Sequence, residues 1–544
     1  MSSATEAAPV ADSGHREILP AEERRVIVAS SVGTVFEWYD FYLYAILAPF
    51  FAGIFFPPGN QTAALLGAFG AYAAGFLVRP FGALIFGRIG DLVGRKYTFL
   101  ITITVMGLST VLVGFLPGYK TIGFAAPLIL IALRLAQGLA LGGEYGGAAT
   151  YVAEHSADDK RGYATAWIQT TATLGMFLAL FIIGICRGAQ EASTFSTWGW
   201  RIAFWFSIPL LAISVYIRLK LQESPVFQRM KTAGKRSKSP LRDSFLEYPN
   251  NKFVALALFG ATAGQGVVWY TGQFYALFFI QIYLKLDFIH TYELVGLSLL
   301  IGTPFFLVFG WLSDRIGRKK IILAGCLIAA VTYIPLFHGL THFINPKLEA
   351  YQTSTPVEVA ATECNFHIFP LPTTVYSPCD KAKDFLGKAG ISFQSVPAQP
   401  GTEVVTKIGN LTLTGFDAAK YTAALKATGY PGDKADLSDV NWVMAELILV
   451  IMLIYVTMVY GPIAAFLVEL FPTKIRYTSM SLPYHIGNGW FGGMLPLLAT
   501  AMVAAAGNIY QGLWYPIIVS ILTVIIGSLL LHETKGVRIR DETF

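Results

Sequence analysis

The chain has 544 residues, of which 54% are hydrophobic and 14% are charged, and its formal net charge at pH 7 is +6. Soluble domains carry about 25% charged residues, so this chain has too few charged groups to cover a globular surface of its size. The composition therefore excludes a soluble enzyme and a disordered protein. The basic excess is better explained by orientation in a membrane than by nucleic-acid binding.

Twelve apolar segments are long enough to be spans, because a helix needs about 20 apolar residues to cross a bilayer. The first six lie near residues 26–51, 64–87, 98–117, 123–152, 163–187 and 200–219. The other six lie near residues 252–284, 291–312, 321–341, 441–468, 477–506 and 509–532. We expect the first span to direct insertion, because residues 1–23 are polar and lack the apolar core of a signal peptide.

The Lys and Arg residues of the short loops lie almost entirely on one side of this arrangement. If the N-terminus is cytoplasmic, the short outer loops contain only Lys120, Arg187, Arg201 and Lys285. Lys and Arg are enriched in cytoplasmic loops, so both termini are predicted to be cytoplasmic.

The spans divide the chain into seven predicted regions. They are a cytoplasmic tail (1–25), an N-terminal six-helix bundle (26–220), a cytoplasmic linker (221–251), three helices of a C-terminal bundle (252–341), an inserted domain (342–440), three further helices (441–532) and a cytoplasmic tail (533–544). The fold class is an all-α polytopic membrane protein with twelve transmembrane helices and one small insert.

The insert interrupts the spans with a moderately hydropathic segment that contains Pro, Gly and Lys throughout. It is predicted to be a small α/β domain outside the membrane. The predicted elements are helices at 381–388 and 417–427 and strands at 391–396 and 404–408. Cys364 and Cys379 can form a disulfide in an oxidising exterior, and two free thiols are the alternative.

Two loops carry one pattern, G-x-x-x-D-x-x-G-R-K, from Gly87 to Lys96 and from Gly310 to Lys319. Glycine permits a tight turn, and aspartate can cap a helix or pair with arginine. The loops follow the second and the eighth span, so they indicate two six-helix halves related by a parallel repeat.

With these loops, the sequence resembles the major facilitator superfamily. Four further segments resemble the metabolite:proton symporter family within it, which includes permeases for α-ketoglutarate, citrate, shikimate and proline/betaine. The segments are Phe36–Tyr42 (FEWYDFY), Arg134–Gly147 (RLAQGLALGGEYGG), Leu221–Pro225 (LQESP) and Glu469–Thr478 (ELFPTKIRYT). The resemblance covers essentially the whole chain except residues 342–440.

The resemblance implies two bundles around a central cavity at mid-membrane, which rock to open it to one side and then the other. It also implies a monomer in the bacterial inner membrane, with a small-molecule substrate, a proton and the lipid bilayer as partners. The repeated loops would hold the bundles together on the cytoplasmic side. The implied gating residues are Gly87, Asp91, Gly94 and Arg95 in the first half and Gly310, Asp314, Gly317 and Arg318 in the second.

Ionisable residues inside spans are functional candidates, because burying a charge in a bilayer is costly. Glu37 and Asp40 lie near the middle of the first span, and their i, i+3 spacing places both carboxylates on one helix face. Arg134 lies at a similar depth in the fourth span. It can pair with one of these carboxylates or bind an anionic substrate group. We assign all three residues to proton coupling, with a purely structural ion pair as the alternative.

Other polar residues of the spans are candidates for substrate binding or gating. Glu144 is expected at the cytoplasmic gate, and His485 can titrate near working pH or simply pack. The predicted substrate-binding residues are Arg79, Arg134, Tyr39, Gln137, Gln265, Trp269, Gln273, His485 and Asn488.

Three functions remain open on these residues. The first is proton-coupled uptake of a small carboxylate. The second is uptake of a zwitterion such as proline or betaine, whose ammonium the aromatic side chains can hold by cation–π contact. The third is a sensor or adaptor in which the insert binds a partner and little is transported. Deletion of residues 345–436 would discriminate, because unchanged transport would mean that the insert is accessory. We expect no enzyme activity, cofactor, metal or nucleic-acid partner, because the sequence contains no constellation for them.

Overall fold

The structure is a computed structural model that describes residues 20–539, except 57–60, 221–222, 224, 233, 235–236, 363, 365–374 and 400. Among the described residues, eleven helical segments are long and apolar enough to cross a membrane. Helix α1 (Pro20–Phe55) packs beside them as the first span. The predicted twelve-helix class is therefore confirmed, and span ends agree within a few residues; the third span, for example, is Lys96–Phe115.

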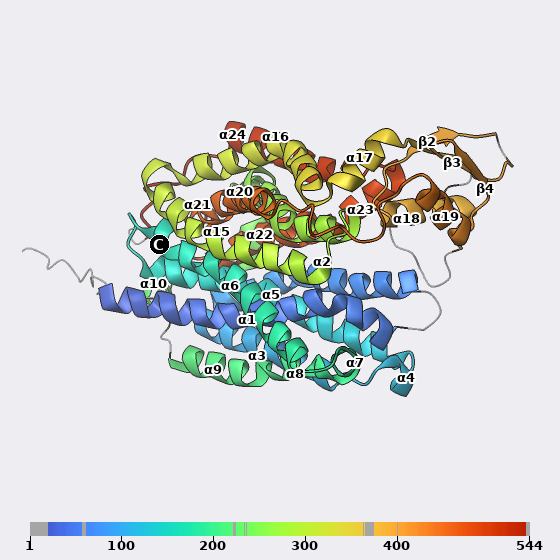
Figure 1. Cartoon of the computed structure of the whole chain (residues 1–544). Coiled ribbons are helices and arrows are strands. Elements are labelled where there is room, and N and C mark those ends of the chain that lie inside the picture. The colour runs from blue at the N-terminus through green and yellow to red at the C-terminus, as the bar shows by residue number, and fades with distance from the viewer. Residues whose placement is uncertain are drawn as a thin grey trace, which may run out of the picture.

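The N-terminal half forms the lower layer in Figure 1. Its first five spans are α1, α2 (Gln61–Leu92), α3 (Arg95–Phe115), α5 (Ala125–His155) and α6 (Arg161–Gly188). Its sixth span consists of η1 (Phe195–Gly199), α8 (Arg201–Trp205) and α9 (Ser207–Lys220). Short helices α4 (Tyr119–Ile122) and α7 (Ala192–Thr194) lie in its connections.

The C-terminal half forms the upper layer, and α10 (Pro225–Thr232) and α11 (Pro240–Phe245) lie in the linker before it. The seventh span joins α12 (Asn250–Ala257), η2 (Leu258–Thr262), α13 (Ala263–Tyr270), η3 (Thr271–Tyr275), α14 (Ala276–Phe278) and η4 (Phe279–Tyr283). The eighth to tenth spans are α15 (Phe288–Ile316), α16 (Arg318–Ile344) and α20 (Trp442–Tyr460) with α21 (Ile463–Leu470). The last two are α22 (Arg476–Ile486) with η5 (Gly487–Gly492) and α23 (Leu495–Ala506), and η6 (Gln511–Leu513) with α24 (Trp514–Leu530).

Helices α2 and α5 approach closely because glycines line their contact. A Cβ atom on Gly138 would collide with the carbonyl oxygen of Gly75, and one on Gly142 would collide with that of Arg79. Small residues let membrane helices pack backbone to backbone. The glycine-rich segment of the fourth span thereby holds α5 against the helix that carries Arg79.

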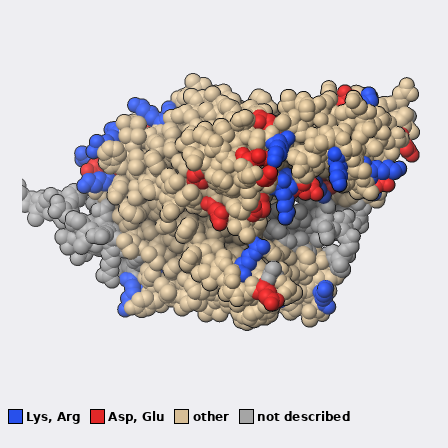
Figure 2. All heavy atoms as spheres, viewed as in Figure 1, with Lys and Arg blue, Asp and Glu red and all other residues tan. Residues whose placement is uncertain are grey.

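The flanks of the bundle are apolar. Large side chains such as Leu77, Val331 and Leu529 are 52%, 70% and 76% exposed. On the face shown in Figure 2, Lys and Arg lie on and beside the insert and also at the end of the bundle opposite the insert. We call this end, which carries both described chain ends, the terminal end, and the opposite one the insert end.

The insert is a four-stranded sheet with helices on it. Its elements are α17 (Pro346–Ser354), β1 (Val357–Ala361), α18 (Pro378–Lys388), β2 (Gln394–Pro397), β3 (Val405–Ile408), β4 (Leu411–Thr414) and α19 (Ala418–Ala427). The strand order is β2-β1-β3-β4, and only β1 and β2 pair in parallel. Cys364 and Cys379 form a disulfide. Strands β1 and β4 are additions to the elements predicted from the sequence.

Hydrogen bonds attach the insert to the C-terminal half. The Phe393 amide donates to the Gly507 carbonyl at 2.6 Å, and the Ala435 amide donates to the Lys285 carbonyl at 2.9 Å. The Asn345 side chain donates to the Leu284 carbonyl at 3.0 Å. The insert is therefore joined to the insert ends of the seventh and eleventh spans.

Candidate functional site

The aspartates of the two repeated loops each cap a helix of the other half at the terminal end. Asp91 accepts hydrogen bonds from the Thr478 amide at 2.9 Å and the Thr478 hydroxyl at 2.7 Å, at the start of α22. Asp314 accepts from the amides of Gly162 and Tyr163, both at 2.8 Å, at the start of α6. Carboxylates at helix N-termini are stabilised by free amides and the helix dipole, so each loop joins the two bundles.

Two buried ion pairs also cross between the halves. Glu154 lies 3.1 Å from Arg476, and Glu469 lies 2.8 Å from Arg161. The order Glu-x₆-Arg spans the loop after the fourth span (Glu154, Arg161) and the equivalent loop after the tenth (Glu469, Arg476), and each glutamate pairs with the arginine of the other loop. This repeated spacing is the signal that could have identified the four residues in the sequence.

The second repeated loop joins the same network. Arg318 lies 2.8 Å from Asp314 and 3.0 Å from Glu469. The glycines of the pattern allow the close approach, since a Cβ on Gly310 would lie 2.7 Å from the Gly162 carbonyl oxygen and one on Gly87 would lie 3.1 Å from the Thr478 Cα.

Gly94 and Gly317 have φ of 138° and 113°, which side chains rarely adopt. The Arg95 side chain lies outside the described part of the structure. Together, the repeated loops and crossed ion pairs close the bundle at the terminal end.

Aromatic side chains of both halves meet in the middle of the bundle. Trp38 lies 6.0 Å from Trp269 between ring centroids, and Phe76 lies 5.6 Å from Tyr270. The Tyr42 hydroxyl group and the Trp269 indole nitrogen are buried and have no hydrogen-bond partner among the described residues. An aromatic cluster with unused donors is suited to contact a polar ligand.

Arg79 occupies the boundary between the halves beside this cluster. It is 1% exposed, and its Nε and Nη1 atoms have no hydrogen-bond partner among the described residues. A Cβ on Gly489 of η5 would touch the Arg79 side chain at 3.8 Å. His485 and Tyr270 lie within electrostatic range of the guanidinium, and both ring nitrogens of His485 also lack partners in this part of the chain. A buried guanidinium with unsatisfied donors is costly, and an anion is the kind of group that can satisfy them.

The predicted substrate-binding residues of the seventh span, Gln265, Trp269 and Gln273, fall into two groups. Gln265 and Asn488 exchange two amide hydrogen bonds of 3.0 and 2.8 Å, which joins the seventh and eleventh spans. The Gln273 amide has no partner among the described residues. Gln273 and Trp269 are thus available to a ligand, whereas Gln265 and Asn488 satisfy each other.

Arg134 does not pair with Glu37 or Asp40. Its guanidinium lies over the Tyr44 ring at 4.4 Å from the centroid and donates to the Gln137 side chain at 2.5 Å. Its Nε and Nη2 atoms have no hydrogen-bond partner in the described structure. The ion pair that the sequence allows between Arg134 and a carboxylate of α1 is therefore not formed, because the aromatic rings of α1 and α2 hold the guanidinium away from both carboxylates.

The two carboxylates of α1 have other partners. Glu37 lies 3.2 Å from Arg218 of α9, and both side chains are buried. Asp40 accepts from the Ser207 hydroxyl at 2.5 Å. Arg218 lies two residues before the end of α9, and no local signal in the sequence shows that it turns inward.

Tyr39 and Glu144 are two further candidates. Tyr39 donates to the Ala203 carbonyl at 2.7 Å and so packs against the sixth span. Glu144 is 2% exposed, and its carboxylate has no hydrogen-bond partner among the described residues. No group of three metal-ligating residues occurs in the described part of the chain.

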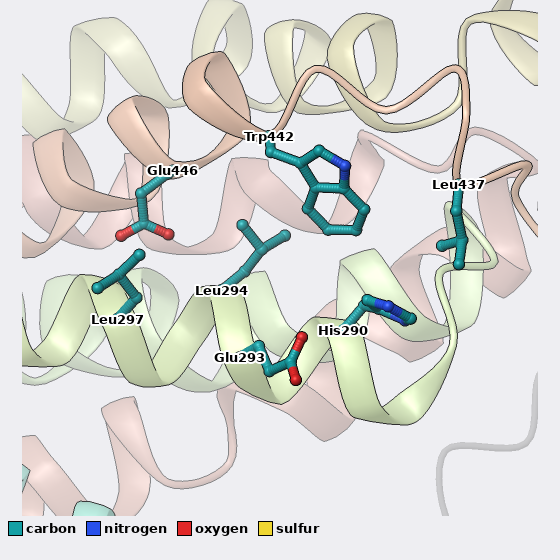
Figure 3. A pocket seen from close by; sticks show the side chains of 7 residues that line it. All are labelled: His290, Glu293, Leu294, Leu297, Leu437, Trp442 and Glu446. Atoms are coloured by element: carbon teal, nitrogen blue, oxygen red, sulfur yellow. The ribbon is translucent and has the colours of Figure 1, made fainter.

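A groove of about 500 Å³ lies at the insert end between α15 and α20 (Figure 3). Its lining residues are His290, Glu293, Leu294, Leu297, Leu437, Trp442 and Glu446. None of the predicted substrate-binding residues lines it, so the groove is separate from the Arg79 cluster.

Comparisons with known proteins agree with this architecture. The sequence model of the Major Facilitator Superfamily matches residues 30–343, which end just before the insert. The structure is similar to the proton:xylose symporter XylE, with a TM-score of 0.63 at 15% identity over 96% of this chain and 98% of that chain.

Three curated relatives from Escherichia coli K12 are similar in sequence. The inner membrane metabolite transport protein YhjE is 36% identical over 61% of this chain and 76% of its own length. The alpha-ketoglutarate permease is 34% identical over 59% of this chain and 72% of its own. The proline/betaine transporter is 34% identical over 58% of this chain and 64% of its own.

Proposed function

The chain belongs to the Major Facilitator Superfamily, and we propose that it is a symporter that takes up a small organic carboxylate together with a proton. The observation that carries this proposal is the pair of buried guanidiniums, Arg79 and Arg134, each with nitrogen atoms that lack a partner among the described residues. A guanidinium binds a carboxylate with two parallel hydrogen bonds. The relatives named for metabolites and alpha-ketoglutarate support the same substrate class.

In this proposal Arg79 is the first contact of the substrate carboxylate. It lies between the halves, beside Gly489 and the aromatic cluster, so a ligand bound there touches both bundles. Trp269, Gln273 and His485 would contact the remainder of the ligand. A ligand shifts the equilibrium between two conformations only if it contacts them differently. Alternating access therefore requires a ligand whose binding draws the two halves together.

The proton would be carried by the carboxylates of α1. Glu37 and Asp40 are 2% and 6% exposed and lie on one helix face, and each has a single strong partner in the other spans. Release to the cytoplasm requires the contacts of Asp91, Asp314 and the crossed ion pairs at the terminal end to separate. The terminal end would then be closed while the substrate and the proton are loaded and open while they are released.

The test is uptake of radiolabelled organic acids into vesicles with an imposed pH gradient. At least one acid is expected to accumulate only when the outside is acidic. Glu37→Gln and Asp40→Asn are each expected to abolish accumulation against a gradient. If both variants still concentrate the acid, the assignment of the proton site is wrong.

Replacement of Arg79 tests the substrate class. Loss of a charge-assisted hydrogen bond costs about 1.5–3 kcal/mol, so Arg79→Gln is expected to weaken apparent affinity roughly tenfold or more. Arg315→Gln is the matched control, because Arg315 is exposed at the terminal end and its guanidinium stacks on Trp311, 3.9 Å from the ring centroid. Equal affinities of the Arg79 and Arg315 variants would exclude Arg79 from the binding site.

A second candidate function is uptake of a zwitterion. The cluster around Trp38 and Trp269 offers aromatic faces for a quaternary ammonium, and one relative is named a proline/betaine transporter. Competition by citrate, α-ketoglutarate, shikimate and betaine for the labelled substrate separates the two candidates.

The remaining assignments follow from the proposed function. The protein acts as a monomer in the bacterial inner membrane with both termini in the cytoplasm, and the insert lies in the periplasm. It is a transporter without enzymatic activity, cofactor or nucleic-acid partner. The domain limits are those given from the sequence, with the insert at residues 342–440 between the ninth and tenth spans.

A further inference from the structure

The groove between α15 and α20 is lined by two glutamates without a matching cation. Both carboxylate oxygens of Glu446 on α20 are buried and have no hydrogen-bond partner among the described residues. Glu293 of α15 is exposed. Among the lining residues only His290 can carry a positive charge, and its Nδ1 atom lies 2.5 Å from an oxygen of the Asp287 carboxylate. The groove is therefore an acidic site whose buried acceptors are unused.

The unused oxygens define the chemistry of a fitting ligand. A carboxylate only accepts hydrogen bonds, and leaving it buried without a donor is costly. A divalent metal ion fits poorly, because no group of three metal-ligating side chains occurs in the part of the chain that the structure describes. A primary ammonium supplies both a positive charge and three N–H donors. The Trp442 indole points from α20 toward α15, as the Glu446 carboxylate does (Figure 3), and offers a face for cation–π contact.

The walls of the groove are continuous with the apolar flank of the bundle. Its apolar lining residues are Leu294, Leu297 and Leu437. On α15, Glu293 lies in a helical stripe of exposed residues that also contains Ile289, Leu297 and Leu300. On α20, the exposed neighbours of Glu446 are Val443 and Leu447. The groove thus adjoins the surface that faces acyl chains, which favours a ligand with an apolar part over a fully soluble one.

The depth of Glu446 matches the headgroup layer of a bilayer. Trp442 is the first residue of α20, and Glu446 follows one turn later, which is about 6 Å along the helix axis. Each headgroup layer is about 5–7 Å thick, and tryptophan is enriched at this level. A carboxylate at this depth meets lipid headgroups, and the adjoining leucines meet the first carbons of the acyl chains.

We propose that the groove binds the ammonium group of an aminophospholipid in the leaflet at the insert end. Glu446 accepts hydrogen bonds from the ammonium, the Trp442 ring covers it, and Glu293 adds a second negative charge. The Leu297 side chain packs against an acyl chain. This lipid site goes beyond the proposed symport, because it uses neither the substrate arginines nor the carboxylates of α1.

The test compares three lipids on the purified full-length protein by native mass spectrometry, which counts the lipid molecules that stay bound. They are phosphatidylethanolamine, phosphatidylcholine and phosphatidylglycerol. Phosphatidylethanolamine is expected to bind one site about tenfold more tightly than the others, because a quaternary ammonium has no hydrogen to donate and a glycerol headgroup has no positive charge. Equal affinities of the first two lipids would overturn the proposal.

Two variants locate the site. Glu446→Gln removes the charge, and Leu297→Trp fills the groove without altering any charge; each is expected to lower the affinity for phosphatidylethanolamine about tenfold. Glu191→Gln is the matched control, because Glu191 is an exposed glutamate beyond the insert end of α6 and does not line the groove. It is expected to bind as the wild type does. Wild-type affinity in both groove variants would show that the lipid binds elsewhere and would overturn the proposal.

A competition experiment identifies the source of the ammonium. Free ethanolamine carries the same ammonium without acyl chains, and a large excess is expected to leave phosphatidylethanolamine bound to the wild type. Displacement of the lipid by ethanolamine would assign the groove to a soluble amine and overturn the lipid assignment. None of these measurements uses transport, so their outcome is independent of the uptake assay.

Discussion

The Glu37–Arg218 pair shows how a single buried residue changes the interpretation of a motif. Glu37 lies in the segment FEWYDFY, and its partner is 181 residues away on the last helix of the same half. Arg218 also stacks on Phe99, with its Cζ atom 4.1 Å from the ring centroid. The guanidinium is thus held by an anion and a ring together, and its Nε and Nη1 atoms have no partner among the described residues.

Removal of one member of this pair should destabilise the protein more than removal of both. Arg218→Leu leaves Glu37 buried without a counter-charge, which costs about 3–5 kcal/mol for a buried pair, and the thermal midpoint of the purified protein is expected to fall. Adding Glu37→Gln should recover most of the loss, because a neutral amide needs no counter-charge. A double variant no more stable than Arg218→Leu would show that Arg218 acts through packing on Phe99 alone.

At the scale of elements, the contact between α2 and α5 positions both candidate substrate arginines. Arg79 is on α2 and Arg134 is on α5, and the glycine contact between Gly138 and the Gly75 carbonyl fixes their separation. A shift of either helix relative to the other would therefore displace a guanidinium. Gly138 thereby determines the distance between the two arginines, although it has no side chain of its own.

Gly138→Ala is expected to lower stability and uptake together. The added methyl meets a backbone carbonyl that cannot rotate away, and overpacking of this kind costs about 1–3 kcal/mol. Gly184→Ala on α6 is the control, because nothing lies within 4 Å of a Cβ at that position. The measurements are the thermal midpoint and the apparent affinity for the labelled substrate; equal values for the two variants would contradict a close α2–α5 contact.

At the scale of the whole molecule, crossed ion pairs connect the two halves at the terminal end. Glu154–Arg476 and Glu469–Arg161 are related by the internal repeat, and Arg318 adds a second cation beside Glu469. These groups are buried because the two halves touch at this end. When the end opens, water reaches the ion pairs, so the pairs stabilise the closed state.

Glu469→Gln is expected to favour opening of the terminal end. The variant weakens the pairs with Arg161 and Arg318 but leaves the Glu154–Arg476 pair. Accessibility is measured with a membrane-impermeant maleimide on Ser481→Cys, a buried position facing Gly146, in a background without the free cysteines. Labelling from the terminal side should rise several-fold, whereas Glu247→Gln, an exposed linker variant, should not change it; unchanged labelling in both would show that Glu469 does not hold the end closed.

Properties that depend on residues close together along the chain could be predicted without the structure. Spans, their number, the internal repeat and the position of the insert follow from local hydropathy and spacing, because each span must satisfy its own backbone in the membrane. The shared face of Glu37 and Asp40 follows from helical periodicity alone.

The contacts between buried groups, in contrast, could not be predicted without the packing of the helices. The partners of Glu37, Asp40 and Arg134, the mutual bonding of Gln265 with Asn488 and the crossing of the Glu-x₆-Arg pairs all depend on distances between helices far apart in the sequence. Hydropathy and helical periodicity specify which face of a helix is polar, but the rotation and packing of its neighbours determine the residue that this face contacts.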